Sequence, residues 1–100
     1  MQPLDLTVTV DRPIPAAQTQ ILDRVDSRMQ SVGFTGHPQD NGVNYRPKFI
    51  GLVLVWLIRR LQDEHVLFTF ERRGPVTEVR VTGKLRSRAR AEVTEALGGY

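Results

Sequence analysis

Cysteine is absent from this sequence of 100 residues. Its absence excludes disulfide frameworks, thiolate nucleophiles and every zinc site that needs sulfur ligands. The first twenty residues also lack the continuous apolar stretch of a signal peptide, because they contain Asp5, Asp11 and three prolines. We therefore expect an intracellular, cytoplasmic protein.

Catalytic motifs are missing as well. The sequence has no glycine-rich phosphate loop, no HExxH or GxSxG motif and no paired histidines. His37 stands among turn-forming residues, and no serine, glutamate or second histidine is tied to it at a catalytic spacing. We therefore expect a protein that is not an enzyme and that uses no metal or other cofactor.

Long blocks of one charge sign are also absent. The formal net charge of +3 is unevenly distributed, because residues 1–45 carry a net charge of −2 and residues 46–100 carry +5. A basic half suits a nucleic acid or an anionic lipid, whereas interspersed acidic residues are typical of an ordinary solvated surface. Charge alone therefore identifies no partner.

The N-terminal third contains the periodic patterns of a strand and a helix. Over residues 4–10, apolar side chains alternate with Asp and Thr, which predicts a strand with one buried face. Over residues 17–32, apolar side chains recur every three or four positions, which predicts a helix. Pro13 and Pro15 separate the two elements, and Gly33 fits the left-handed position that follows a helix.

The middle of the chain is rich in turn-forming residues. Residues 35–48 contain Gly, Pro, Asn and Asp and predict a loop, with a short strand over residues 43–46. Within this loop, the dipeptide Asn41-Gly42 predicts a type I′ turn that reverses the chain.

Alternating apolar residues predict an antiparallel hairpin over residues 65–73 and 76–82, turning at Arg73-Gly74. The expected register places apolar residues opposite one another. It pairs Phe70 with Thr77, Phe68 with Val79, and Val66 with Val81.

A second helix is predicted over residues 85–97, ended by Gly98-Gly99. With 40% hydrophobic and 25% charged residues, residues 1–100 form one domain of ordinary globular composition. We expect an α+β fold, a two-layer sandwich in which an antiparallel sheet of about four strands carries two helices on one face. The expected order is β-α-(β)-β-β-β-α.

The most apolar segment is FIGLVLVWLI, residues 49–58. Its β-branched residues favour a strand over residues 50–59, in which Ile58 lies opposite Val66 and Trp56 opposite Phe68, facing the helices. The other face of this strand would carry Val53, Val55 and Leu57, joined by Leu67 of the next strand. An exposed apolar stripe of this kind usually marks an interaction site.

Three interpretations of this stripe remain open. The first strand, the N-terminal loop or part of residues 35–48 could fold over it, leaving the strand buried on both faces. A homodimer or a protein partner could cover it instead. Residues 49–60 could also lie on a membrane surface, with Trp56 and flanking cations at the headgroups. Ten residues of helix reach only about 15 Å, half the hydrocarbon thickness, so we expect no transmembrane span.

The ending GKLRSRARAEVTEAL, residues 83–97, follows the predicted hairpin and resembles the last helix of double-stranded RNA-binding domains. The resemblance implies that basic residues at the helix start contact phosphates. The matching residues are Lys84, Arg86, Arg88 and Arg90. The family's lysine pair is replaced here by Arg86-Ser87, and this chain begins with a strand that the family lacks. The alternative is that Arg88 pairs with Glu92 along the helix and the other cations are solvated.

Taken together, these patterns predict a small non-enzymatic binding or assembly module. We expect it to self-associate or to bind a protein partner through the apolar stripe. The alternatives are nucleic-acid binding by the basic start of the last helix and peripheral membrane contact.

Overall fold

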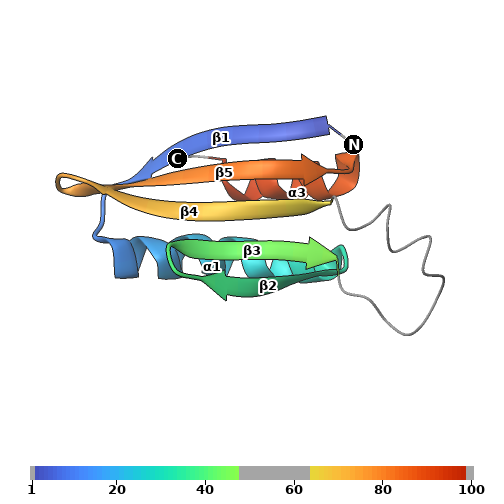
Figure 1. The fold of residues 1–100 in the computed structure, drawn as a ribbon, viewed down its shortest axis with the longest axis horizontal. Coiled ribbons are helices and arrows are strands. Elements are labelled where there is room, and N and C mark those ends of the chain that lie inside the picture. The colour runs from blue at the N-terminus through green and yellow to red at the C-terminus, as the bar shows by residue number, and fades with distance from the viewer. Residues whose placement is uncertain (1, 48–63, 99–100) are drawn as a thin grey trace.

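The structure is a computed structural model that describes residues 2–47 and 64–98. It contains an antiparallel five-stranded sheet of order β1-β5-β4-β3-β2 and two helices (Figure 1). The α+β two-layer sandwich predicted from the sequence is confirmed, with five strands rather than about four. The strands are β1 (Gln2–Val10), β2 (Phe34–Gln39), β3 (Gly42–Pro47), β4 (His65–Arg73) and β5 (Val76–Leu85), and the helices are α1 (Ile14–Ser31) and α3 (Ser87–Ala96).

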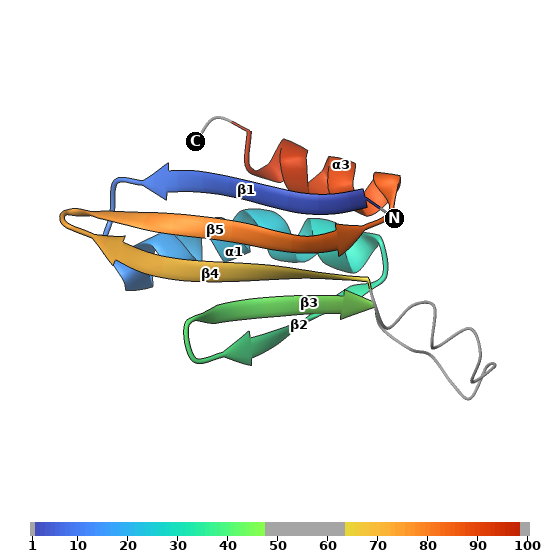
Figure 2. The ribbon, with the colours of Figure 1, turned by 45° about the horizontal axis from the view of Figure 1, so that its top comes forward.

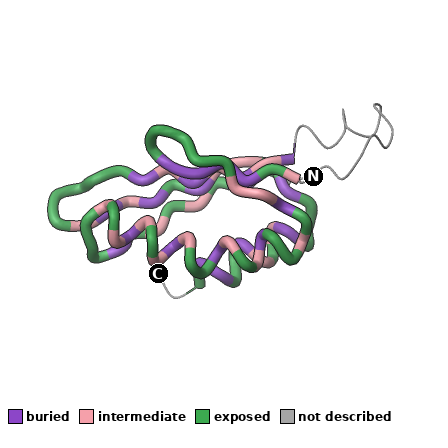
Figure 3. The backbone as a smooth tube through the Cα atoms, turned by 90° about the horizontal axis from the view of Figure 1, so that it is seen from below, coloured by how far each residue is buried: buried purple, intermediate pink, exposed green. Residues whose placement is uncertain are grey.

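Both helices lie on the same face of the sheet (Figure 2), and Figure 3 shows the sheet and the helices as two layers. The hydrophobic core fills the space between the layers. Every described element contributes buried apolar residues to it, from Leu4 of β1 to Val93 of α3. We call the other side of the sheet the open face, because none of the described helices covers it.

Helix α1 forms where the apolar periodicity predicts it. Ala17, Ile21, Val25 and Met29 are buried along one side of the helix. The helix starts after Pro13, and the chain leaves it through Gly33, whose φ of 85° is a left-handed conformation that glycine adopts without strain.

The short strand predicted over residues 43–46 is confirmed as part of β3, but the loop predicted before it is wrong, because Phe34–Gln39 form β2 and pair with β3 in a hairpin. Gln39 pairs with Gly42, so the two turn residues are Asp40 and Asn41 rather than Asn41 and Gly42. Pro38 lowers the strand propensity of β2, but proline is tolerated in a strand at the edge of a sheet. Hydrogen bonds from β3 therefore determine this strand, and the local sequence does not.

The β4–β5 hairpin forms as predicted, but its register differs by two residues. Phe70 pairs with Val79, Phe68 with Val81, and Val66 with Gly83. The turn consists of Gly74, with a φ of 64°, followed by Pro75, which is the conformation expected of a type II′ turn. A shift of two residues leaves the same side chains facing the helices, so the predicted faces are correct. β5 also continues to Leu85, and α3 therefore begins at Ser87.

β4 lies between β3 and β5. Tyr45 is opposite Val66 and Val43 is opposite Phe68, on the side away from β5. The predicted pairing of Ile58 and Trp56 with these two β4 residues is therefore wrong. The strand predicted over residues 50–59 itself lies outside the described residues.

Tyr45 connects the sheet to α1. Its side chain is buried, its hydroxyl donates to Asp26 Oδ1 at 3.0 Å, and its ring meets Phe68 edge to face at 5.7 Å. Burial, and then the hydrogen bond to the Asp26 carboxylate, raise the pKa of the Tyr45 hydroxyl above its ordinary value. The folded state therefore favours the protonated phenol.

This preference predicts how Tyr45→Phe changes the stability. The stabilisation from the raised pKa is complete below the unfolded-state pKa of about 10 and is lost as the pH rises toward the higher folded-state pKa. Tyr45→Phe should cost about 1 kcal/mol at neutral pH through the lost hydrogen bond. Above about pH 10 its free energy of unfolding should fall less steeply than that of the wild type. Urea unfolding at neutral and alkaline pH measures both effects, and a steeper alkaline fall in the variant would contradict the assignment.

Candidate binding surface at one end of the sheet

Several chain segments meet at one end of the sheet, which we call the connection end. β3 ends there at Pro47, and β4 begins there at His65, because Tyr45 and Val66 are paired in adjacent antiparallel strands. β5 also ends there, since Lys84 is opposite His65. Residues 48–63 therefore leave and rejoin the described structure at this end.

An ion pair links the start of β4 to the start of α3 at the connection end. Arg86 Nε donates to Glu64 Oε1 at 2.9 Å, and Arg86 Nη2 donates to Glu64 Oε2 at 2.7 Å. The side chain of Glu64 is 1% exposed, whereas that of Arg86 is 55% exposed. The hydrogen bonds to Glu64 raise the pKa of the Arg86 guanidinium, so Arg86 is positively charged at neutral pH.

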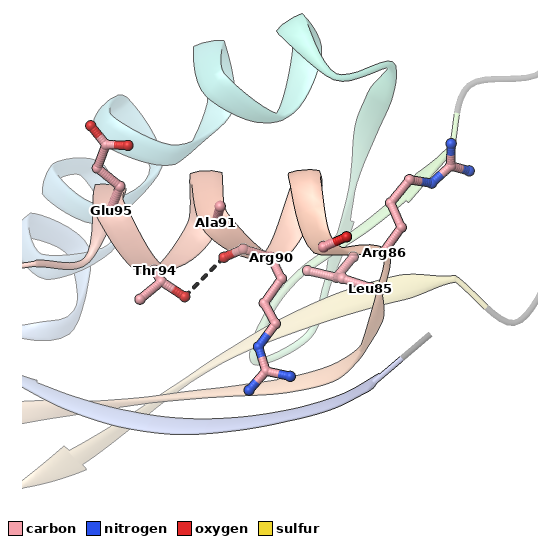
Figure 4. Close-up of a pocket in the computed structure, with 7 residues that line it drawn as sticks. Leu85, Arg86, Arg90, Ala91, Thr94 and Glu95 are labelled. Carbon is pink, nitrogen blue, oxygen red and sulfur yellow. Dashed lines mark hydrogen bonds between the residues drawn. The ribbon is translucent and has the colours of Figure 1, made fainter.

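The predicted anion-binding residues do not point into one site. Figure 4 shows Arg86 and Arg90 extending in opposite directions from α3. Arg86 bonds Glu64, while Arg90 Nη1 donates to the carbonyl oxygen of Pro3 at 3.2 Å. Lys84 is exposed on β5 and Arg88 is exposed on α3. The positive charge of Arg86 is thus already matched by a carboxylate.

The predicted pairing of Arg88 with Glu92 is replaced by a contact between the two helices. Arg28 Nη1 of α1 lies 3.3 Å from Glu92 Oε2 and 3.5 Å from Glu95 Oε1 of α3. The side chains of Arg28, Glu92 and Glu95 are 38%, 32% and 71% exposed, so water screens these ion pairs and they contribute little to stability.

A hollow lies beside α3 near β1 (Figure 4). Its α3 residues are spaced by three and four positions, as expected for one side of a helix. They include Arg90 and Glu95, with the small side chains of Ser87, Ala91 and Thr94 between them. The hollow therefore presents charged side chains of both signs beside the apolar side chains of Leu85 and Ala91.

The open face is polar in its described part. Two of its arginines lie close to acids, with Arg80 Nε 3.7 Å from Asp5 Oδ1 and Arg73 Nε 3.4 Å from Glu78 Oε2. The four aromatic residues of the described chain are buried and face the helices; they are Phe34, Tyr45, Phe68 and Phe70. The described open face therefore lacks the stacking platform with which many sheets bind single-stranded nucleic acids.

Leu67 is the described member of the predicted interface. It alternates with the buried Val66 and Phe68, so its side chain is on the open face, where it is partly buried. Asn44 and Thr82 are its cross-strand neighbours. The other predicted interface residues, Val53, Val55 and Leu57, lie outside the described residues.

Glu64 is the residue of this end that sequence reasoning missed. It lies between the strands predicted over residues 50–59 and 65–73, and a glutamate in such a connection is usually solvated. Its partner Arg86 is 22 residues away along the chain. No local spacing indicates such a pair, because the strand order alone brings the start of β4 next to the start of α3.

Residues 2–47 and 64–98 contain neither a cluster of metal-binding side chains nor a membrane-spanning helix. In this part of the chain no group of three His, Asp or Glu side chains could hold a metal ion. Neither described helix is long and apolar enough to cross a membrane.

Comparison with known proteins adds no family to this geometry. No protein-family model matches the chain. Neither a curated protein nor a solved structure matches it. The sequence and the described contacts are therefore the basis for inferring function.

Proposed function

We propose that this domain is a non-enzymatic binding or assembly module. Its contact surface is the apolar segment 49–58, through Val53, Val55 and Leu57, together with Leu67 on the open face. The occupant is a second copy of the chain or another protein with an apolar surface.

The observation that supports this proposal is the position of two segments, the first strand and residues 34–47. Either of them could have covered the apolar stripe only if it lay outside the sheet. The first strand is β1, and residues 34–47 are β2 and β3, all of them members of the sheet itself. A strand within the sheet cannot also fold over the open face. These two segments are therefore not available to cover the stripe.

The remaining surfaces of the domain also suit segment 49–58 poorly. Helices α1 and α3 already cover the helix-facing core, whose residues are nearly free of solvent contact. The described open face is largely polar, and even the cross-strand neighbours of Leu67 are the polar residues Asn44 and Thr82. Burying ten largely apolar residues against charged and hydroxyl groups would leave those groups poorly solvated. An intermolecular contact removes the apolar surface without this cost.

Anionic membrane contact is a second candidate function, favoured by the charges of the connection end. Exposed Arg46, Lys84 and Arg88 lie at or near this end, and Lys48, Arg59 and Arg60 flank the apolar segment in the sequence. Cations close to a membrane surface contribute about 1 kcal/mol each to binding anionic lipid.

Val55→Glu tests the proposed function. A charge at a buried or interfacial position is strongly disfavoured, so we expect the molar mass of the wild-type assembly to fall, as measured by light scattering over a dilution series. Gln39→Glu, which adds the same charge at an exposed position of β2, should leave the mass unchanged.

Two outcomes of this experiment would be decisive against the protein-contact proposal. The first is a Val55→Glu protein with unaltered mass and unaltered free energy of unfolding. The second is a monomeric wild type that sediments with vesicles containing phosphatidylserine and loses this binding on Val55→Glu. That second result would establish the membrane candidate instead.

A further inference from the structure

The outer edge of β1 is a second surface that the proposed function does not use. All nine residues of β1 pair with β5 on one side. No described strand lies on the other side, so β1 is one border of the sheet (Figure 2). The opposite border is β2, which is shorter and contains Pro38, two features that protect an edge from further pairing.

Two observations identify the backbone groups that point outward from β1. Pro3 has no N–H, so it cannot exchange two hydrogen bonds with Lys84, the residue opposite it on β5. Its carbonyl oxygen instead accepts a hydrogen bond from Arg90 at 3.2 Å. The N–H and C=O of one strand residue point to the same side, and this side alternates along the strand. Asp5, Thr7 and Thr9 therefore direct their backbone groups away from β5.

The sequence of β1 is complementary to itself in the antiparallel direction. With a two-fold axis at Thr7, Thr7 meets Thr7 of a second copy and Asp5 meets Thr9. These are the residues whose backbone groups point outward, so each such pair can exchange two hydrogen bonds. The register requires no change in the pairing of β1 with β5.

The side chains of this register are compatible on both faces. On the helix side, Leu6 meets Val8 of the copy, and both are only partly buried where they border the core. On the open face, Asp5 is opposite Thr9, so no like charges meet. Asp11 of the copy directly follows its β1, at the end of the contact where Arg90 binds the carbonyl oxygen of Pro3. Residues of opposite charge therefore occur at each end of the contact.

We infer that the β1 edge binds β1 of a second copy of this chain, forming a continuous antiparallel sheet across a two-fold axis at Thr7. The contact is independent of segment 49–58. It uses outward backbone groups from Asp5 to Thr9 and covers the exposed parts of Leu6 and Val8.

Single-cysteine variants test the register directly, because the wild-type chain contains no cysteine. In Thr7→Cys, the two Cα atoms of a hydrogen-bonded pair would be about 5.5 Å apart, a distance within the usual disulfide range. Mild oxidation should therefore give a covalent dimer. In Thr9→Cys, the two cysteines would be offset by about 13 Å along the strands and should not join. Absence of the Thr7→Cys dimer, or equal cross-linking of the two variants, would overturn the inference.

A charge variant provides a test without cross-linking. Thr7 is exposed, so Thr7→Lys should leave the folded subunit intact while placing two like charges opposite each other at the axis. We expect Thr7→Lys to halve the molar mass measured by light scattering. The matched control, Gln39→Lys on the β2 edge, should retain the wild-type mass. An unchanged mass for Thr7→Lys would overturn the inference, and the Thr7→Cys result does not depend on the outcome for Val55→Glu.

Discussion

Arg86→Met is expected to lower the free energy of unfolding by about 3 kcal/mol, because it leaves a buried carboxylate without its partner. Glu64 is 1% exposed, and Arg86 supplies its closest cationic contact at 2.7 Å. Methionine keeps most of the apolar stem of Arg86 but provides no hydrogen-bond donor. Urea unfolding at neutral pH measures the loss.

Replacing Glu64 instead of Arg86 should lower the free energy of unfolding by a smaller amount, because Arg86 is more exposed than Glu64. In Glu64→Gln the guanidinium that remains is 55% exposed and can be solvated. The expected loss is about 1 kcal/mol, the ordinary contribution of a hydrogen bond. The double variant Glu64→Leu with Arg86→Met should recover part of the loss of Arg86→Met, since no charge is then buried. Equal losses for Arg86→Met and Glu64→Gln would show that the burial of Glu64 is not the cause.

Gly42→Ala is the second substitution with a large expected effect. A Cβ atom at this position would overlap the carbonyl oxygen of Phe68 and would lie 2.8 Å from its carbonyl carbon. Both atoms belong to the backbone of β4, so no side-chain rotation can relieve the contact. Overpacking of this kind costs about 3 kcal/mol, and the loss should appear in the urea unfolding of the variant.

Gly74→Ala is the matched control for Gly42→Ala. A Cβ atom at Gly74 would have no atom within 4 Å, and only the φ of 64° disfavours alanine. The expected loss is about 1 kcal/mol, the cost of a left-handed conformation for a residue with a side chain. If both alanine variants lose the same amount, close approach of β3 to β4 is not the role of Gly42.

The accuracy of the sequence predictions differed between elements for physical reasons. The two-residue period of β1 and the helical period of α1 were sufficient, because each element buries one side only. β2 was missed, since Gly36 and Pro38 have low strand propensity and the strand depends on β3 for its hydrogen bonds. The β4–β5 register was displaced by two residues, because such a shift preserves both faces and only the Gly74-Pro75 turn distinguishes the alternatives.

For the candidate surfaces too, local patterns predicted which way a side chain faces but did not predict which side chains meet. The position of Leu67 on the open face follows from alternation along β4. The prediction that Lys84, Arg86, Arg88 and Arg90 act together came from their closeness in sequence. The fold separates them, because Arg86 turns to Glu64 and Arg90 turns to Pro3. The contribution of Val53, Val55 and Leu57 remains a prediction.

The sequence by itself determined the fold class, the two helix faces and the buried side of the strands predicted over residues 4–10, 65–73 and 76–82, because hydrophobic periodicity records which side of an element avoids water. Only the tertiary structure decided that β3 is the neighbour of β4, that Glu64 is paired with Arg86 and that β1 forms an edge of the sheet. These features depend on contacts between segments far apart in the chain. A local pattern shows that a side chain is covered, but it does not show which segment covers it.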